Sequence, residues 1–279
     1  MGVGSPSWIV RGWMAARQSE KVGRIMENII HTIDISNVDR YGFFCYKSKR
    51  KSSGYRHKRD WLSSSMAEGL HIKMIYEESH SAGFVEYAPG EATWRVVNAP
   101  GYLVIHCMWV VGSGQGKGYG ARLLDQLVSE AQNKGMYGVT VVSSASTWLA
   151  KKEFFLHHGF EVVDQAPPSF ELLVKRFGQG ALPSFPQDWE SRLKRIPKGL
   201  VVYHSGQCPY LDMFVNSLEN TATQMGIAIQ TIELKTSREA RALSPSAYGV
   251  FGVVYDGQLL SDRPMGGKTL REFLEKPND

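Results

Sequence analysis

Apolar and polar residues follow one another along the chain in two regular patterns, which predict strands and amphipathic helices. We expect strands where apolar residues alternate or form short runs, and helices where they recur every three or four residues. The clearest helix has Leu123, Leu124, Leu127 and Val128 on one face. The other elements expected in the first part of the chain are strands at 29–34, 71–76, 82–87, 102–111, 138–143, 160–163 and 170–177, and helices at 61–70 and 147–158.

A second block of elements follows a stretch rich in Gly and Pro. Residues 179–198 are predicted to form a linker, and the chain is therefore divided into a domain at 26–178 and a smaller domain at 199–279. Residues 1–25 are predicted to form a loose N-terminal extension. The second domain is expected to contain strands at 199–205, 227–234, 249–255 and 258–261, and helices beginning near 207, 238 and 269.

A glycine-rich turn joins the strand at 102–111 to the helix that follows it. Gly116, Gly118 and Gly120 leave room for an anion and permit backbone angles that aim N–H groups at it, while the helix N-terminus adds positive partial charge. The turn is therefore predicted to bind a pyrophosphate. The P-loop pattern fails because Val111 occupies its first glycine position, and the dinucleotide fingerprint lacks the acidic residue expected about twenty residues further on.

The segment Gln115-Gly116-Lys117-Gly118-Tyr119-Gly120 resembles the Arg/Gln-x-x-Gly-x-Gly/Ala signature of the GNAT superfamily of N-acetyltransferases. The strand at 138–143 and the Gly159-Phe160 junction extend the resemblance. It implies an α/β (α+β) GNAT acyltransferase fold with a mixed, splayed central sheet, and acetyl-CoA (coenzyme A) as co-substrate. The implied cofactor-binding residues are Trp109, Val110 and Val111 on the strand, Gln115, Gly116, Lys117, Gly118, Tyr119, Gly120 and Ala121 in the turn, and Phe155.

The sequence departs from the family where catalytic groups are expected. Direct acetyl transfer needs a base for the acceptor amine, and the family often has a Glu where this chain has Val104. The titratable residue on the same strand face is His106, which is the candidate catalytic base; a His hydrogen-bonded within a packed strand is the alternative. Phe155 occupies the position of the family's Tyr acid, so no phenol is available there.

The second domain resembles a thioredoxin or glutaredoxin fold. Cys208-Pro209-Tyr210 matches a glutaredoxin active site, but Leu211 stands where the partner cysteine belongs. Pro245 matches the position that is cis in that fold. Cys208, at the start of a helix, is expected to have a lowered pKa and is the second candidate catalytic residue. The order of the two domains resembles that of the YoaP-like acetyltransferases.

Composition and charge restrict the partners. The chain has 279 residues, 43% of them hydrophobic, and a formal net charge of +5, which favours an anionic ligand but is too small to predict nucleic-acid binding. Three widely spaced cysteines suggest neither a disulfide framework nor a metal site, and a reducing cytoplasm is expected. No apolar run is long enough to span a membrane. The oligomeric state cannot be read from the sequence.

Three functions remain open at this point. The favoured one is an acetyl-CoA-dependent N-acetyltransferase that acts on the amine of a small molecule or peptide. The alternatives are a CoA-binding regulatory module without transfer activity and a thiol-redox protein that uses Cys208. Residues 47–59, dense in Lys, Arg, Ser and Gly, are expected to form a solvated loop or the acceptor-side edge of the site.

Overall fold

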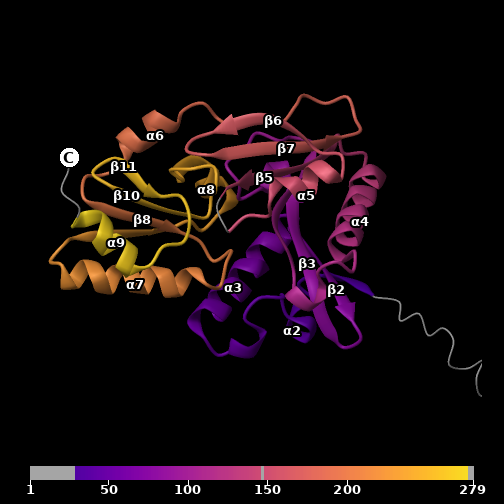
Figure 1. The fold of residues 1–279 in the computed structure, drawn as a ribbon, viewed down its shortest axis with the longest axis horizontal. Coiled ribbons are helices and arrows are strands. Elements are labelled where there is room, and N and C mark those ends of the chain that lie inside the picture. Colours follow the sequence, from indigo (N-terminus) through magenta and orange to yellow (C-terminus); the bar gives the residue numbers. More distant parts are fainter. Residues whose placement is uncertain (1–28, 146–147, 276–279) are drawn as a thin grey trace, which may run out of the picture.

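The computed structural model describes residues 29–145 and 148–275, which form two β-sheets with helices against their faces (Figure 1). The extension expected at residues 1–25 lies outside the described residues. The strands of the larger sheet are β1 (Ile30–Ile33), β2 (His71–Glu77), β3 (His80–Pro89), β4 (Tyr102–Val110), β5 (Gly138–Ser144), β6 (Glu161–Ala166) and β7 (Phe170–Arg176).

The larger sheet is mixed, as the sequence predicted. Its strand order is β1-β2-β3-β4-β5-β7-β6, and every neighbouring pair is antiparallel except β4 and β5. A parallel pair needs a long crossover connection, and helix α4 (Tyr119–Asn133) provides it. The turn that precedes α4 therefore lies at the carboxyl end of β4.

Helices cover both faces of this sheet. The apolar face of α4 is buried as predicted, and it packs against Leu103 and Ile105 of β4. Helix α3 (Ser53–Ala67) covers the other face, where its Trp61 and Leu62 are buried. Because β4 is covered on both sides, an almost unbroken apolar run suits it.

Two helix boundaries differ from the prediction. Helix α3 begins at Ser53, because the Ser52 hydroxyl caps it by accepting a bond from the Tyr55 N–H at 3.3 Å. The prediction of a loop over all of residues 47–59 is therefore wrong beyond this point. Helix α5 (Lys152–His157) begins later than the predicted residue 147. The remaining short helices of this part are α2 (Val38–Tyr41) and the single turns η1 (Lys47–Lys49), η2 (Gly90–Ala92) and η3 (Gly112–Gly114).

The second sheet is formed by the C-terminal part of the chain, and its strand order is β11-β10-β8-β9. Strands β8 and β9 are parallel, and the other two pairs are antiparallel. The segment predicted as a linker contains one short helix, α6 (Trp189–Arg195). The other elements are β8 (Leu200–His204), α7 (Leu211–Gln224), β9 (Ile229–Glu233), α8 (Ser237–Leu243), β10 (Phe251–Tyr255), β11 (Gln258–Ser261) and α9 (Gly267–Leu274).

The peptide bond before Pro245 differs from the expectation. Within the described ranges the cis peptide bond is Pro167-Pro168, so the Ser244-Pro245 bond is trans. Pro245 nevertheless lies against the second sheet, since a Cβ added to Gly252 of β10 would be 2.6 Å from its ring.

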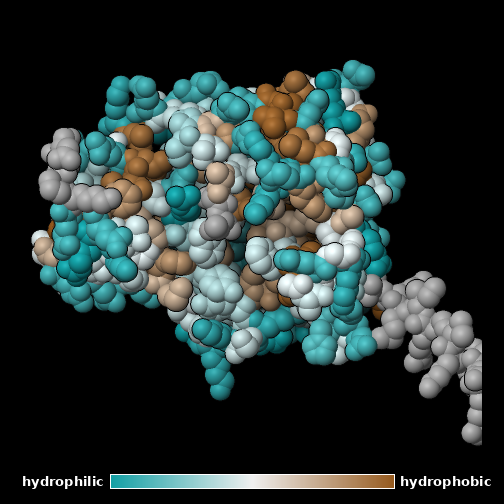
Figure 2. Space-filling model, viewed as in Figure 1, coloured by the Kyte–Doolittle hydropathy of each residue, from teal (hydrophilic) through white to brown (hydrophobic). Residues whose placement is uncertain are grey.

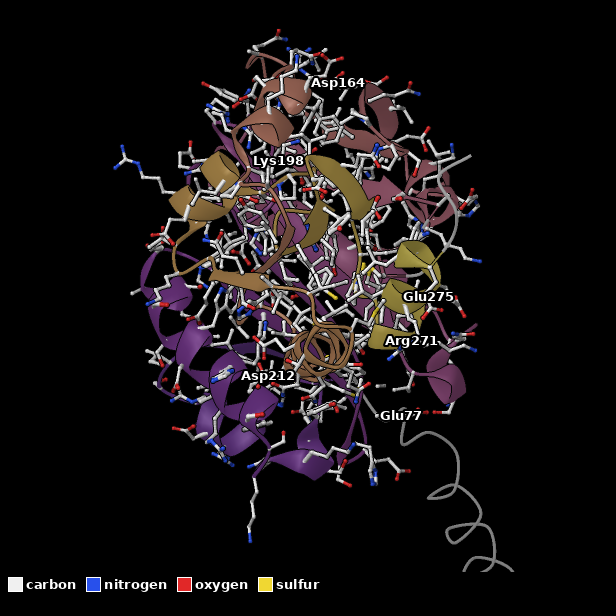
Figure 3. The ribbon with its side chains drawn as sticks, turned by 90° about the vertical axis from the view of Figure 1, so that its left-hand side faces the viewer. Glu77, Asp164, Lys198, Asp212, Arg271 and Glu275 are labelled. Carbon is white, nitrogen blue, oxygen red and sulfur yellow. The ribbon has the colours of Figure 1, made fainter. Side chains whose placement is uncertain are left out.

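The two sheets share one hydrophobic core, in which residues of α3 and β2–β4 pack with residues of β8 and β10. Arg95 is buried at this junction and donates hydrogen bonds to the carbonyl oxygens of His106 on β4 and of Tyr248 before β10. Asp212, in the first turn of α7, pairs with His57 of α3 at 2.7 Å (Figure 3). The C-terminal part is therefore joined to the larger sheet by polar as well as apolar contacts.

None of the described helices has the length and apolar composition needed to cross a bilayer.

Candidate active site

The glycine-rich turn forms an open loop at the N-terminus of α4. Gly116 and Gly118 have φ angles of 78° and 75°, which favour glycine. A Cβ added at either position would meet no atom within 4 Å, so the backbone on this side of the turn is accessible. Because α4 begins at Tyr119, the N–H groups of its first turn have no acceptor within the helix. These groups and the helix dipole together suit a phosphate.

The side chain of Lys117 has a partner within the protein, so phosphate binding is not its only role. Its ammonium forms an ion pair with Glu77 of β2 at 2.6 Å, and the two side chains are 44% and 38% exposed. The ion pair raises the pKa of Lys117 and lowers that of Glu77. The main chain of the turn is therefore the better-placed anion ligand.

Strands β4 and β5 part beside this turn. They pair only from Tyr102 to Ile105 on β4, although β4 continues to Val110. Beyond Ile105 one edge of β4 has backbone N–H and C=O groups that β5 does not use, and such an edge can pair with an extended ligand. The separation of the two strands, which the resemblance to the GNAT superfamily implied, is thus present from His106 onward.

A cavity of about 1310 Å³ extends along the splay. It runs from the glycine-rich turn to the loop between β6 and β7, and it is larger than a typical drug-sized pocket. The face shown in Figure 2 is hollowed near its centre, between the second sheet and β3. The predicted cofactor residues that line the cavity are Trp109, Val110, Gln115 and Gly120.

The other predicted cofactor residues take different positions. Val111 follows the end of β4, Gly116, Lys117 and Gly118 lie in the turn, and Tyr119 and Ala121 lie in the first turn of α4; none of the six lines the cavity. Phe155 is fully buried and packs edge to face on Phe160, so it belongs to the core under α5. Its neighbour Phe154 lines the cavity instead, and a Cβ on Gly120 would come within 3.2 Å of the Phe154 ring.

His106, the candidate base, is enclosed in the sheet. Its side chain has no exposed area, and its Nε2 accepts a hydrogen bond from the Trp94 N–H at 3.2 Å. Burial, followed by the positive charge of Arg95, holds the pKa of His106 well below its ordinary value. A base needs a free lone pair, and the one on Nε2 is occupied. The arrangement therefore favours the alternative of a hydrogen-bonded core histidine.

Glu86 is a buried carboxylate that the sequence analysis did not single out. It lies on β3 opposite Cys107 of β4, beside the start of the splay, and is 1% exposed. One oxygen accepts from the ammonium of Lys58 on α3, and the other accepts from the Gln207 amide at 2.7 Å. A single acid in the apolar stretch 82–87 is the signal that could have identified it.

Cys208 lies near this carboxylate, and its environment differs from the expectation. Burial raises the pKa of the Cys208 thiol, although a backbone hydrogen bond involving Tyr210 lowers it in part. Helix α7 begins only at Leu211, so the thiol precedes the helix rather than lying in its first turn. Burial also raises the pKa of Cys45 to about 12 and that of Cys107 well above its usual range. The surroundings of Cys208 therefore oppose the expected stabilisation of its thiolate.

In the described part of the chain, no group of three or more His, Cys, Asp or Glu side chains could hold a metal ion.

Sequence comparisons identify the family. The model of the acetyltransferase (GNAT) family matches residues 37–160. The uncharacterized N-acetyltransferase YoaP of Bacillus subtilis is 31% identical over 242 residues, which cover 85% of this chain and 95% of YoaP. The chain belongs to the GNAT family of acetyltransferases. It is therefore an enzyme of the acyltransferase class, and the larger sheet with its splay is the GNAT sheet.

Solved GNAT structures resemble the chain over about half of its length. The PaiA N-acetyltransferase of Thermoplasma acidophilum, solved in complex with coenzyme A, has a TM-score of 0.39 and 13% identity and covers 53% of this chain and 99% of its own. The ribosomal-protein-S18-alanine N-acetyltransferase of Escherichia coli also has a TM-score of 0.39 and 13% identity, and covers 55% of this chain and 96% of its own.

Proposed function

We propose that this GNAT enzyme transfers the acetyl group of acetyl-CoA directly to the amine of an acceptor molecule. The observation that carries the proposal is the open glycine turn at the N-terminus of α4, which leads into the cavity between β4 and β5. A pyrophosphate-binding turn next to an unpaired strand edge suits a ligand with a diphosphate and an extended amide arm. Coenzyme A has both features.

In the proposed complex, the turn from Gln115 to Ala121 binds the pyrophosphate through main-chain N–H groups. The pantetheine arm pairs with the free edge of β4 at Trp109, Val110 and Val111. The thioester then lies near the start of the splay, where the strands separate after Ile105. The coenzyme A in the PaiA structure supports this choice of co-substrate.

The proposed reaction is a single displacement at the thioester carbonyl. The amine nitrogen forms a bond to the carbonyl carbon, the carbon–sulfur bond breaks, and the amine proton ends on the CoA sulfur. A cavity that orients the two reactants supplies much of the acceleration by itself. Main-chain N–H groups at the splayed edge of β4 are placed to stabilise the oxyanion.

We further propose that residues 199–279 form a thioredoxin-like domain, joined to a GNAT domain at 26–178 by a linker at 179–198. The support is the strand order β11-β10-β8-β9 with β8 and β9 parallel, and the position of Cys208-Pro209-Tyr210 between β8 and α7. The trans bond before Pro245 departs from that fold. Three free cysteines suit a reducing cytoplasm, which we propose as its location.

A second candidate function is a CoA-binding regulatory module without transfer activity. The enclosure of His106 favours it, because this candidate base cannot reach an acceptor from its position in the sheet. The raised pKa of Cys208 gives no support to a thiol-redox function.

Calorimetric titration with CoA and acetyl-CoA, followed by an assay of free thiol release with a panel of amines, tests the proposal. Binding together with amine-dependent thiol release is the expected result. Binding without thiol release from any amine would identify the regulatory module instead. Absence of CoA binding would contradict both functions.

A further inference from the structure

The positive charge of the chain is concentrated in one short segment. Residues 47–56, the basic segment, contain five Lys and Arg and no Asp or Glu. Removing these five from the 32 Lys and Arg of the chain leaves 27, which equals its 27 Asp and Glu. The formal net charge of +5 therefore arises, in effect, from this segment, whose cations are Lys47, Lys49, Arg50, Lys51 and Arg56.

These cations are not paired with carboxylates in the described part of the chain, although the hydrogen bond from Arg59 and, to a smaller extent, the charge of Arg50 lower the pKa of Asp39. Within the described residues none of the five forms an ion pair with a carboxylate, whereas Arg59, three residues further on, binds Asp39 through two nitrogens at 2.7 and 3.0 Å. Hydrophilic residues dominate the surface of this region, over the loop that precedes α3 in Figure 1 (Figure 2). The segment thus has positive charge available to a ligand.

Two of the cations are held close together. A Cβ added to Gly42 would lie 3.4 Å from a terminal nitrogen of Arg50 and 3.6 Å from Cε of Lys47. Both side chains therefore pack over Gly42. Burial, followed by the charge of Arg50, lowers the pKa of Lys47. Placing like charges side by side opposes folding unless an anion binds there.

A row of aromatic side chains connects the basic segment to the cavity. The aromatic ridge consists of Tyr46, Tyr210, Trp148 and Phe214, which come from both parts of the chain. Tyr46 and Tyr210 have ring centroids 4.5 Å apart, and Tyr210 and Trp148 have centroids 6.3 Å apart. Lys49 lies over the Tyr46 ring at 5.2 Å, and Leu149, next to Trp148, lines the cavity.

We propose that the acetyl acceptor is an acidic peptide, whose carboxylates contact the basic segment while its amine passes along the aromatic ridge into the cavity. This inference rests on the proposed acetyl transfer and names the chemistry of its acceptor. The cations contact different neighbours, such as the Tyr46 ring for Lys49 and the Lys51 carbonyl oxygen for Arg56. An extended ligand with several carboxylates can contact more of the five cations at once than one small anion can.

The test compares three peptides that share one lysine and its immediate neighbours but carry acidic, neutral or basic flanks. Initial rates of CoA release are measured at low and high NaCl with saturating acetyl-CoA. We expect kcat/KM to be at least tenfold higher for the acidic peptide than for the neutral one at low salt, and this preference to shrink as salt screens the charges. The basic peptide is expected to be the poorest acceptor.

The double variant Lys49→Glu/Arg50→Glu reverses the charge of two exposed side chains. Its KM for the acidic peptide should rise at least tenfold, while its Kd for acetyl-CoA and its rate with a small amine that carries no carboxylate remain unchanged. The matched control is Lys194→Glu/Lys268→Glu, which makes the same charge change on side chains 78% and 90% exposed in the C-terminal part.

Each outcome has a distinct meaning. Equal kcat/KM for the three peptides, a preference for the basic peptide, or an equal effect of both double variants would overturn the acidic acceptor while leaving acetyl transfer intact. Failure of acetyl-CoA to bind, or absence of transfer to every peptide and to the small amine, would overturn the proposed function itself.

Discussion

The backbone conformation of one glycine determines how the turn binds its ligand. Gly118 precedes α4 with a φ of 75°, where a β-branched side chain costs about 1–2 kcal/mol and would enter the space left for the anion. Gly118→Val is therefore expected to abolish CoA binding. Lys117→Ala should weaken it only slightly, because Lys117 is exposed and paired with Glu77. Calorimetry with CoA measures both affinities, and equal small losses would exclude main-chain binding by this turn.

His106 should reveal its burial through the pH dependence of stability. Its pKa is lowered in the folded state, so between its unfolded pKa near 6.5 and the lower folded value only the unfolded chain binds this proton. Stability must therefore fall as the pH drops below about 6.5, by up to ~1.4 kcal/mol per pH unit from this one group. His106→Gln should reduce that slope.

Urea unfolding of wild type and His106→Gln at several pH values between 5 and 7.5 measures the effect. His204→Gln serves as a comparison, because burial also lowers the pKa of His204 on β8. A wild-type slope that persists unchanged in His106→Gln would show that His106 is accessible to protons. Such a result would restore it as a candidate base.

We expect Cys208 to be less reactive than a model thiol, which is opposite to the prediction from its sequence context. Because burial raises its pKa, Cys208 should react with iodoacetamide more slowly than a small model thiol at pH 8. Mass spectrometry of time points from the native protein gives the rate at each cysteine. Alkylation of Cys208 faster than the model thiol would return the thiol-redox function to consideration, and denatured protein provides the reference for full accessibility.

The sequence was sufficient to predict those features that depend only on residues close together in the chain. The conformation of Gly116 and Gly118 and the buried face of α4 depend on neighbours in the chain, so the glycine-rich turn and the helix after it could be predicted. The surroundings of Glu86 could not be predicted, because its hydrogen-bond donor Gln207 is 121 positions away in the sequence. The enclosure of His106 could not be predicted for the same reason, since the groups that enclose it come from Trp94 and Arg95 in another loop.

At the scale of the elements, the side chain of Glu130 connects α4 to the larger sheet through hydrogen bonds and ion pairs. Glu130 accepts hydrogen bonds from Tyr87 of β3 at 2.7 Å and forms ion pairs with Lys73 of β2 and Lys134, each at 2.8 Å. Burial raises its pKa, but the bonds from Lys134, Lys73 and Tyr87 outweigh burial and lower the pKa to about 2. The carboxylate therefore stabilises the fold above pH 4.5, and this contribution is lost as the pH falls towards 2.

Glu130→Gln should destabilise the protein by on the order of 1–3 kcal/mol at pH 7, because it removes a charged acceptor of three bonds. The difference from wild type should shrink between pH 4.5 and 2 as the wild-type carboxylate becomes protonated. Urea unfolding across this range measures it. Glu190→Gln, which alters an exposed carboxylate at a loose i,i+4 pair, is the control and should have almost no effect. A pH-independent difference would contradict this role of the charge.

Secondary structure was predicted more reliably than the connections between its elements. The pattern of residues 71–76 and 82–87 correctly predicted β2 and β3, which pair as an antiparallel hairpin with a register shift between Ile75 and Tyr76. The start of α3 was missed because residues 47–59 are mostly polar, and the buried residues in this first part of the helix are Gly54, Tyr55 and Lys58. Lys58 is buried because it forms an ion pair with Glu86 on β3. Such a contact between distant elements cannot be read from the local sequence.

At the scale of the whole molecule, the C-terminal part completes the core of the GNAT part. The buried guanidinium of Arg95 has no carboxylate partner in the described chain, and one of its two carbonyl acceptors belongs to Tyr248. Gly249 approaches Trp94 so closely that an added Cβ would lie 1.9 Å from the Trp94 carbonyl oxygen. Removing the C-terminal part would thus expose apolar core and leave buried polar groups without partners, each costing about 1–3 kcal/mol.

We therefore expect the intact chain to unfold in a single transition, and residues 1–178 alone to be insoluble or to unfold at a much lower urea concentration. Far-UV circular dichroism reports both sheets, while tryptophan fluorescence reports all seven tryptophans, among them Trp61 and Trp94 at the junction, whose ring centroids lie 5.1 Å apart. The two urea curves should coincide, because a shared core couples both parts. Separate transitions, or a stable 1–178 fragment that binds CoA as tightly as the full chain, would show that the C-terminal part is an independent domain and that the CoA site is built without it.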